Sequence, residues 1–469
     1  MLVTNDEHGR PVPDLAAEVP TLANHGISAD GLTITYRLRR GVRWHDGAPF
    51  TSADVKFSFD AIMNGANNVI SRHGYDVVSA VDTPDQYIVT FHLKRRFAPF
   101  VATVFGESDS PYGVIPEHLL AKYRSLNDVP YNSKPVGTGP FRVVDWKRGD
   151  RIELAAFDGY FRGKPGLRKI VVRLVPDENT EITQLRSHEI DLMDEASVSA
   201  YKLLRTLPGI GLDLQAINGY EGVLMNVARG ATADLRVRRA VSLALDRRTL
   251  AENLSFGSGT PATADLPNWM WAYDTSLKVP PHDPAEARAL LAAAGYGPGK
   301  KRLSLGLYFD QSTAINRTAS VQIQSALAAL GVDVQMHPQV DTILYGAYQA
   351  GGTLQQGKYD LALYPWVSGI DPDDSSQFLC DARNGKGYNS SGYCSPEMDR
   401  AQAAALGDYD LTARKRDYAT IQRLVMRDLP VACIWWPRIA YGYNPALHGF
   451  APNPVDEAWN AWRWSLGGP

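Results

Sequence analysis

Apolar and polar side chains alternate with a period of two along several stretches of the first 230 residues. The alternation at residues 32–39 and 87–93 predicts strands of sheets that bury one face. One helix is predicted near them, beginning at Thr51 or Ser52, which offer an N-cap, and ending near Met63. The first part of the chain is therefore predicted to be mostly sheet.

Between residues 231 and 430 the apolar positions follow a helical period, with strands between the helices. Residues 283–286 place Pro at the first helical position and Glu where a capping box needs it, and residues 411–427 form one long predicted helix. Strands and helices are predicted to alternate at residues 303–309, 314–330, 332–336, 342–349 and 359–364. This β-α-β-α-β order is typical of a parallel sheet covered by helices.

Residues 431–469 return to a strand-like pattern, first at residues 431–440, and end in a Trp-rich tail. The character of the chain thus changes near residue 230 and again near residue 430. We interpret this as one α/β lobe inserted into another, with residues 1–229 and 433–469 in the first lobe and residues 230–432 in the second. Two segments would then cross between the lobes, and a ligand cleft is expected between them.

The charge balance excludes one large class of partners. The chain of 469 residues has 48 Lys and Arg against 51 Asp and Glu, a formal net charge of −3. A dedicated nucleic-acid binder needs a basic surplus to replace the counterions of the phosphates, so no nucleic-acid partner is predicted. No apolar run approaches the roughly 20 residues that a bilayer requires. The first three residues are followed by the polar run Asn5 to Glu7, with no basic segment and no apolar stretch of a signal peptide, so the protein is expected either to be cytoplasmic or to have its real N-terminus upstream.

Searches for enzyme and cofactor motifs are mostly negative. The sequence has neither a phosphate-binding loop nor a nucleophile elbow, and its ten His residues are scattered, so no cofactor and no metal site is predicted. The acidic run that begins at Asp371 is the best candidate for a catalytic site, because a pair of carboxylates could carry out glycoside hydrolysis. Adjacent acids after a strand more often cap the next helix or turn. Cys380 and Cys394 could form a disulfide or remain two reduced thiols.

Aromatic side chains favour a binding protein. Trp366 lies at the carboxyl end of a predicted parallel strand, which is where open α/β sheets place ligands. Trp435 lies on a predicted crossing segment, and Trp269 lies in a loop after Pro267. Taken singly, such residues more often fill a core, but together at the ends of elements they favour the wall of a cleft.

Several long motifs, in order along the chain, resemble the signature stretches of family 5 extracellular solute-binding proteins, the peptide/nickel-type receptors of ABC importers. One of them is Pro135-Val-Gly-Thr-Gly-Pro-Phe. The others are residues 9–16, 30–59, 234–247, 392–399 and 428–431. The resemblance extends over essentially the whole chain.

The resemblance implies a two-lobed α/β periplasmic-binding-protein fold, of the Venus-flytrap, type II-like kind. An added subdomain is expected in the first lobe, at about residues 18–134. It also implies a monomeric extracytoplasmic receptor that closes on its ligand by hinge motion and delivers it to an ABC permease in the inner membrane. A signal peptide upstream of Met1 and a disulfide between Cys380 and Cys394 are expected on the same ground.

The resemblance also suggests which residues line the cleft. Carried over position by position, and together with Trp269 from the aromatic argument, the candidate ligand-binding residues are Phe100, Tyr220, Glu221, Val223, Trp269, Trp366, Ser368, Asp371 and Trp435. Peptide-binding relatives hold the ligand's α-amino group with an Asp three residues after a Trp like Trp366, whereas this chain has Gly369 there. An oligopeptide or dipeptide is the leading ligand. A sugar, an opine-like compound and a nickel chelate are the alternatives, and a glycoside hydrolase using Asp371 is the alternative of another class.

Overall fold

The computed structural model of the chain describes residues 1–108 and 110–467, and it divides into two compact units. Unit 1 comprises residues 1–215, the short segment Gly369–Asp371 and the chain from Ala440 onward. Unit 2 comprises Ala216–Ser368 and Pro372–Ile439. Its ends lie outside the predicted limits of 230 and 432, because the strands that enter and leave this unit belong to its main sheet.

Unit 1 is built from several small sheets and short helices. The sheets have the orders β1-β2, β3-β5-β4, β6-β7-β8, β10-β17-β9 and β18-β19. The strands are β1 (Val3–Asn5), β2 (Pro11–Pro13), β3 (Thr33–Arg37), β4 (Val78–Asp85), β5 (Ile88–Leu93), β6 (Phe141–Lys147), β7 (Arg151–Ala156), β8 (Lys169–Arg173), β9 (Leu192–Ala196), β10 (Gly211–Ala216), β17 (Arg438–Tyr443), β18 (Leu447–His448) and β19 (Ser465–Leu466). The helices are α1 (Ser52–Met63), α2 (Phe100–Thr103), α3 (Glu117–Leu120), α4 (Glu178–Arg186) and α5 (Val198–Leu204).

The alternating pattern of the first residues produces the sheet β3-β5-β4. Strands β3 and β5 pair antiparallel, with Tyr36 opposite Val89, and both of these side chains are buried. Helix α1 begins with a capping box in which the Thr51 backbone N–H donates to the carboxylate of Asp54 at 2.9 Å. This helix packs on the sheet through Phe59, so the predicted helix and the two predicted strands form one layered core.

Unit 2 is organised around one six-stranded sheet. Its order is β12-β16-β11-β15-β13-β14. The strands are β11 (Gly219–Met225), β12 (Thr260–Pro261), β13 (Ser304–Asp310), β14 (Asp333–Gln339), β15 (Leu361–Val367) and β16 (Val431–Trp436). The helices are α6 (Leu235–Ala244), α7 (Arg247–Ser255), α8 (Pro284–Ala293), α9 (Ala314–Ala328), α10 (Asp341–Leu344), α11 (Ser375–Phe378), α12 (Pro396–Gly407) and α13 (Leu411–Asp428).

The sheet of unit 2 is mixed. Strand β13 runs parallel to β14 and β15, as the alternation of strands and helices predicts. The parallel order predicted for the strands between residues 303 and 364 is confirmed, and strand β11, which lies outside that prediction, runs antiparallel to both β15 and β16. The direction of β11 is set by pairing with β15 and β16, which lie far along the chain, so nothing local to the sequence determines it.

Two predicted elements are shorter in the structure. The strand predicted over 431–440 is two strands, because Pro437 separates β16 from β17 and has no N–H to contribute to a ladder. The helix predicted over 342–349 ends at Leu344, two residues before Gly346. Within the described residues, no helix is long and apolar enough to span a membrane.

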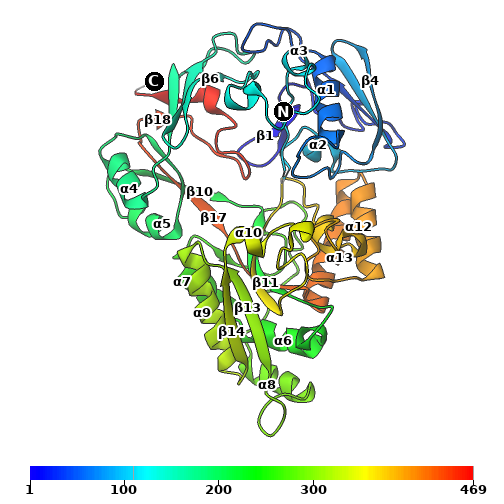
Figure 1. Cartoon of the computed structure of the whole chain (residues 1–469), viewed down its shortest axis with the longest axis vertical. Helices are drawn as coiled ribbons and strands as arrows, with labels where there is room; N and C mark the ends of the chain where they lie inside the picture. The colour runs from blue at the N-terminus through cyan, green and yellow to red at the C-terminus, as the bar shows by residue number, and fades with distance from the viewer. Residues whose placement is uncertain (109, 468–469) are drawn as a thin grey trace. The chain divides into compact units, whose positions relative to one another are not determined.

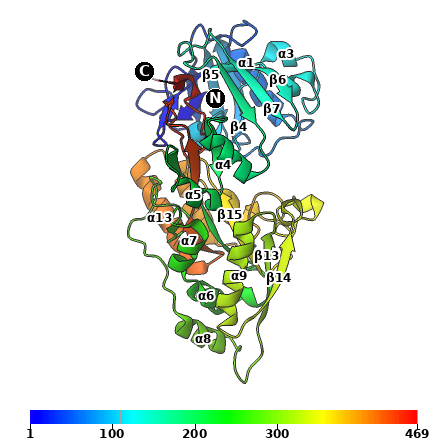
Figure 2. The same cartoon turned by 90° about the vertical axis from the view of Figure 1, so that its left-hand side faces the viewer.

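Helices cover both faces of the unit 2 sheet (Figure 1). On one face α7 and α9 pack over side chains such as Val223 and Leu307, and Figure 2 shows α9 alongside β13 and β14. On the other face α12 and α13 pack over side chains such as Tyr220 and Leu224. Successive residues of β11 therefore enter different cores, which is why this strand is almost entirely apolar apart from Glu221.

Candidate ligand site

Several strands of unit 2 end at the same edge of its sheet. The parallel strands β13, β14 and β15 end at Asp310, Gln339 and Val367. Strand β16 also ends there, at Trp436, and the antiparallel strand β11 begins there, at Gly219. In open α/β sheets, ligands bind beyond the carboxyl ends of parallel strands. We call this edge the carboxyl edge of unit 2.

Aromatic rings gather at the carboxyl edge around Trp366. The indole of this half-buried residue donates a hydrogen bond from Nε1 to Oγ of Ser368 at 3.0 Å. Its ring lies nearly parallel to that of Tyr364, at 21° and a centroid distance of 6.4 Å, and meets Tyr388 edge-on at 5.6 Å. The backbone N–H of Ser368 donates to the carbonyl oxygen of Asn218 at 2.6 Å. These contacts hold the indole in one orientation at the end of β15.

Glu221 is the polar exception in strand β11. Its backbone lies opposite Pro365 of β15 on one side and Trp435 of β16 on the other. The Oε2 atom is buried and has no hydrogen-bond partner among the described residues. Burial raises the pKa of this carboxyl to about 8. Burial, followed by the negative charges of Glu221 and Asp310, also raises the pKa of Tyr345, so this phenol lies close to both acids.

Four of the predicted ligand residues lie inside cores. Tyr220 and Val223 are buried on opposite faces of the unit 2 sheet, and the hydroxyl of Tyr220 donates to Oε1 of Gln377 at 2.8 Å. Trp435 packs in the same core as Val223. In unit 1, Phe100 is fully buried and its ring centroid lies 5.3 Å from that of Phe91. Contact of these four residues with a ligand stays a prediction.

Trp269 lies in the loop before α8, where it meets Trp436 edge-on at a centroid distance of 6.0 Å. The guanidinium of Arg438 lies 5.7 Å from the centre of its ring. Its Nε1 atom is buried and finds no acceptor in the part of the chain that the structure describes. A donor left in this way is a candidate contact for a ligand oxygen.

Asp371 belongs to unit 1, whereas Trp366 and Ser368 belong to unit 2. The close packing of the backbone at Gly369, two residues before Asp371, explains why position 369 carries no acid. A Cβ atom at Gly369 would lie 2.7 Å from Cα of Ser108 and 2.9 Å from the carbonyl oxygen of Glu107. Any side chain at this position would have to displace backbone, so Gly369 is required here for a close approach of two segments.

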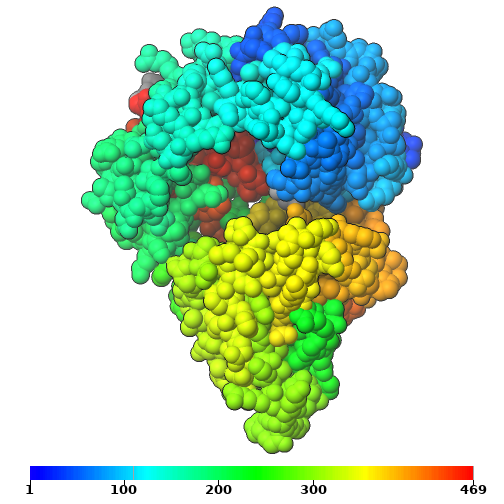
Figure 3. Space-filling view, viewed as in Figure 1, coloured from blue at the N-terminus to red at the C-terminus, as the bar shows by residue number. Residues whose placement is uncertain are grey.

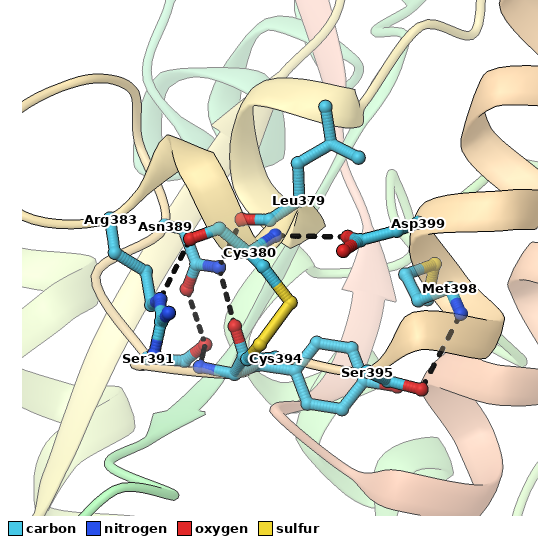
Figure 4. The surroundings of a disulfide bond; sticks show 10 residues. Leu379, Cys380, Arg383, Asn389, Ser391, Cys394, Ser395, Met398 and Asp399 are labelled. Carbon is cyan, nitrogen blue, oxygen red and sulfur yellow. Dashed lines mark hydrogen bonds between the residues drawn. A yellow bond between two sulfur atoms is a disulfide. The ribbon is translucent and has the colours of Figure 1, made fainter.

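A disulfide bond joins Cys380 to Cys394, as the resemblance implies. Figure 4 shows the hydrogen bonds around it. The N–H of Cys380 donates to Oδ1 of Asp399 at 3.0 Å, and the amide of Asn389 donates to the carbonyl oxygens of Leu379 and Tyr393 at 2.9 and 2.8 Å. The bridged loop contains the aromatic partner of Trp366, so the disulfide fixes one side of the carboxyl edge.

Some residues of the carboxyl edge were not predicted from the sequence, namely Tyr345, Tyr364 and Tyr388. Tyr345 follows the short helix after β14, and loops that follow parallel strands lie at the ligand edge of such sheets. Applying that rule to every predicted strand would have found Tyr345. Tyr388 lies in the loop closed by the disulfide. The conformation of this loop, which places Tyr388 against Trp366, cannot be predicted from local sequence. Across residues 1–108 and 110–467, no group of three or more His, Cys, Asp or Glu side chains could hold a metal ion.

Comparison with known proteins gives a consistent result. Residues 10–388 match the family described as bacterial extracellular solute-binding proteins, family 5 Middle. The chain is similar to Di/tripeptide-binding protein 2 of Pseudomonas aeruginosa (strain UCBPP-PA14), with 28% identity over 94% of this chain and 86% of that protein. It is also similar to the oligopeptide-binding protein AppA of Bacillus subtilis (strain 168), with 24% identity over 93% of this chain and 81% of that protein.

Among solved structures, the chain resembles NikZ from Campylobacter jejuni in complex with Ni(L-His), with a TM-score of 0.84 and 25% identity. The match covers 99% of this chain and 93% of that chain. This likeness confirms the predicted two-lobed α/β periplasmic-binding-protein fold.

Proposed function

Because this chain belongs to the family 5 bacterial extracellular solute-binding proteins, we propose that it is the substrate-binding protein of an ABC importer and captures a short peptide. The family is described as solute-binding proteins, which supports a binding role over the catalytic role considered for Asp371. The named relatives that bind di-, tri- and oligopeptides support the choice of ligand. We further propose that the protein works outside the cytoplasm, as a monomer that delivers the peptide to a membrane permease.

The observation that carries the proposal is the carboxyl edge of unit 2. It presents the oriented indole of Trp366 and the unpaired Nε1 of Trp269 toward one face of the sheet, and the unpaired Oε2 of Glu221 toward the other face, with both polar atoms lacking a partner among the described residues. A peptide has the matching chemistry, because its side chains pack on aromatic rings and its amide and terminal groups pair with fixed polar atoms. Ligand-induced closure is proposed to turn about the places where the chain passes from one unit to the other, at Ala216, at Ile439 and on both sides of Gly369–Asp371.

Thermal unfolding with added peptides tests the proposal. Di-, tri- and nonapeptides at about 100 times the dissociation constant should stabilise the protein by about 2.7 kcal/mol, because they bind only the folded state. Calorimetry would then give the affinity and stoichiometry of each peptide that raises the unfolding temperature. If no peptide of any length stabilises the protein or binds in the calorimeter, the proposal is wrong.

A nickel chelate is a second candidate, favoured by the likeness to NikZ in complex with Ni(L-His). The described residues form no metal-binding cluster, so such a ligand would have to bring its own donor atoms. Calorimetry with nickel alone and with nickel plus L-histidine separates the two cases. Binding that requires both components, and that peptides do not displace, would favour the chelate.

A further inference from the structure

We propose that Glu221 makes the site selective for cationic ligands. It favours ligands that bring an ammonium or guanidinium group to the carboxyl edge of unit 2. This inference rests on the proposed function and adds a requirement to it. The ligand must carry a cation where it meets strand β11, either as its α-amino group or as a Lys-like or Arg-like side chain.

The first argument is the position of the carboxyl group. Glu221 lies where β11 begins, between Pro365 and Trp435, at the edge where parallel strands end. The other side chains of this strand are apolar or, like Tyr220, have their polar atom satisfied inside the core. An acid is therefore not required by the packing of this strand. An apolar residue of the same size would avoid the cost of burying a carboxyl group.

The second argument is that the carboxyl group lacks a protein partner. Its buried Oε2 atom accepts no hydrogen bond from the described residues, and burial is the single cause found for its altered pKa. A neighbouring Lys, Arg or His would lower that pKa, and none within the described chain does so. Buried acids in proteins are almost always paired, so a missing partner at a ligand edge points to a partner supplied by the ligand.

The third argument is the surrounding surface. Tyr345 is 37% exposed and Val367 is 50% exposed, and Pro365 is exposed beside them. The segment that contains α10 and leads to Tyr345 lies on the surface in Figure 3, where it is yellow. An aromatic ring beside a carboxylate attracts a cation and shields it from water, which strengthens the ion pair.

Binding then moves a proton in a defined direction. In the empty protein the carboxyl of Glu221 holds its proton near neutral pH, because burial disfavours the ionised form. When the cation arrives, this proton leaves to solvent and the carboxylate pairs with the ligand. The titratable group that interacts with Glu221 is Tyr345, from the loop after α10, and the negative charges of Asp310 and Asp341 act on the same phenol. Strands β15 and β16 present Pro365 and Trp435, which do not titrate.

Two pairs of peptides test the inference by calorimetry. Ala-Lys-Ala is compared with Ala-norleucine-Ala, and Ala-Ala-Ala with its N-acetylated form, so that each pair differs in one ammonium group. For the wild-type protein we expect at least one cationic member to bind about tenfold more tightly, as a charge-assisted hydrogen bond predicts. Titrations at pH 7 in phosphate and in Tris, whose ionisation enthalpies differ, should show release of up to about one proton per ligand.

Variant E221Q keeps the shape of the side chain and removes its charge. It should lose the discrimination within the pair and the proton release, while E252Q, at an exposed position on α7, should behave as the wild type. Thermal unfolding without ligand gives a second measurement. As the pH rises from 5 to 8, the unfolding temperature of the wild type should fall relative to that of E221Q. The reason is that the Glu221 carboxyl keeps its proton to higher pH in the folded protein than in the unfolded chain.

The outcomes separate this inference from the proposed function. Peptides that bind without discrimination in either pair, or an E221Q protein that discriminates as the wild type does, would overturn the inference and leave the function intact. Tighter binding of the cationic peptides with no proton release would show that Glu221 does not ionise to meet the cation, which also overturns it. If no peptide binds at all, the proposed function fails and the inference fails with it.

Discussion

The carboxyl groups of Asp265 and Asp374 lie within hydrogen-bonding reach of each other in the interior of unit 2. Both side chains are almost fully buried, and the amide of Gln402 donates to Oδ1 of Asp374 at 2.6 Å. Two ionised carboxylates this close repel each other, so the folded protein is expected to keep a proton on the pair. Burial raises the pKa of both groups, and the charge of Asp265 raises that of Asp374 further.

We predict that this pair makes the protein less stable as the pH rises. The folded protein keeps the shared proton to a higher pH than the unfolded chain does. The contribution is therefore complete below an ordinary Asp pKa and is lost as the pH rises through the folded value. For one proton the slope is at most about 1.4 kcal/mol per pH unit. Variant D265N supplies a neutral amide donor, so its free energy of unfolding should depend less on pH, as measured by chemical denaturation between pH 4 and pH 8.

The control for this series is D381N, which changes an exposed acid of the same unit. Its unfolding free energy should follow that of the wild type at every pH. If D265N retains the full pH dependence of the wild type, the two carboxyls do not share a proton.

The disulfide between Cys380 and Cys394 should stabilise unit 2. It closes a loop with a sequence separation of 14 residues. In the chain-entropy model a loop of about 15 residues contributes about 3 kcal/mol. The double variant C380S/C394S should lose about that much unfolding free energy, and reduction of the wild type should have the same effect.

The third cysteine gives an internal control for that experiment. Cys433 is buried, and burial raises the pKa of its thiol. Thiol-labelling reagents should therefore modify two cysteines in the reduced folded protein and the third only after unfolding. Rapid labelling of Cys433 in the folded protein would contradict its placement in the core.

Trp366 is predicted to carry a large share of the binding free energy. Its indole is oriented by Ser368 and by two tyrosine rings, so little side-chain entropy is lost when a ligand packs on it. Replacing an anchoring Trp by Ala typically costs about 2 kcal/mol or more, roughly thirtyfold in Kd. W366A should weaken peptide binding by that factor in calorimetry, and S368A, which leaves the ring in place, should weaken it less. Equal affinities for W366A and the wild type would exclude Trp366 from the site.

Local patterning explains why several elements could be predicted from the sequence. The alternation in β3 and β5 and the capping box before α1 act within a few residues, and each survives in the structure. The long helix α13 ends at Asp428, one residue beyond its predicted end. The direction of β11 was not predictable, because it depends on strands more than a hundred residues away in the sequence.

The site could be predicted only in part, for the same reason. The position of Trp366 at the end of a strand follows from the strand pattern. The unpaired state of Glu221 does not, since an acid beside apolar residues looks the same in sequence whether or not a cation lies near it. The pair of Asp265 and Asp374 is likewise created by two loops that meet only in the folded chain. From the sequence, Gly369 is only a departure from the pattern of peptide-binding relatives. The structure explains it, because the backbone of Ser108 leaves no space for a side chain at this position.

In unit 1, a buried carboxylate connects three distant segments of the chain. Glu107 accepts hydrogen bonds from the hydroxyl of Thr4, from Nδ2 of Asn5 at 2.8 Å and from Nδ2 of Asn453 at 3.1 Å. The amide of Asn453 also donates to the carbonyl oxygen of Asn5 at 3.0 Å. The first strand of the chain, the loop after α2 and the C-terminal tail therefore meet at one side chain.

We predict that E107A destabilises unit 1 by about 2–4 kcal/mol. It leaves up to three buried donors without their acceptor, and each such loss typically costs about 1–3 kcal/mol, part of which water entering the site would recover. Hydrogen exchange should show where the stability is lost: amides near Thr4 and Asn453 should exchange faster, while those of β13 in unit 2 should not change. E7A, which removes an exposed acid from the turn between β1 and β2, should leave both regions as they are in the wild type. Uniformly faster exchange in both units would mean that Glu107 supports the whole molecule and not the junction of these three segments.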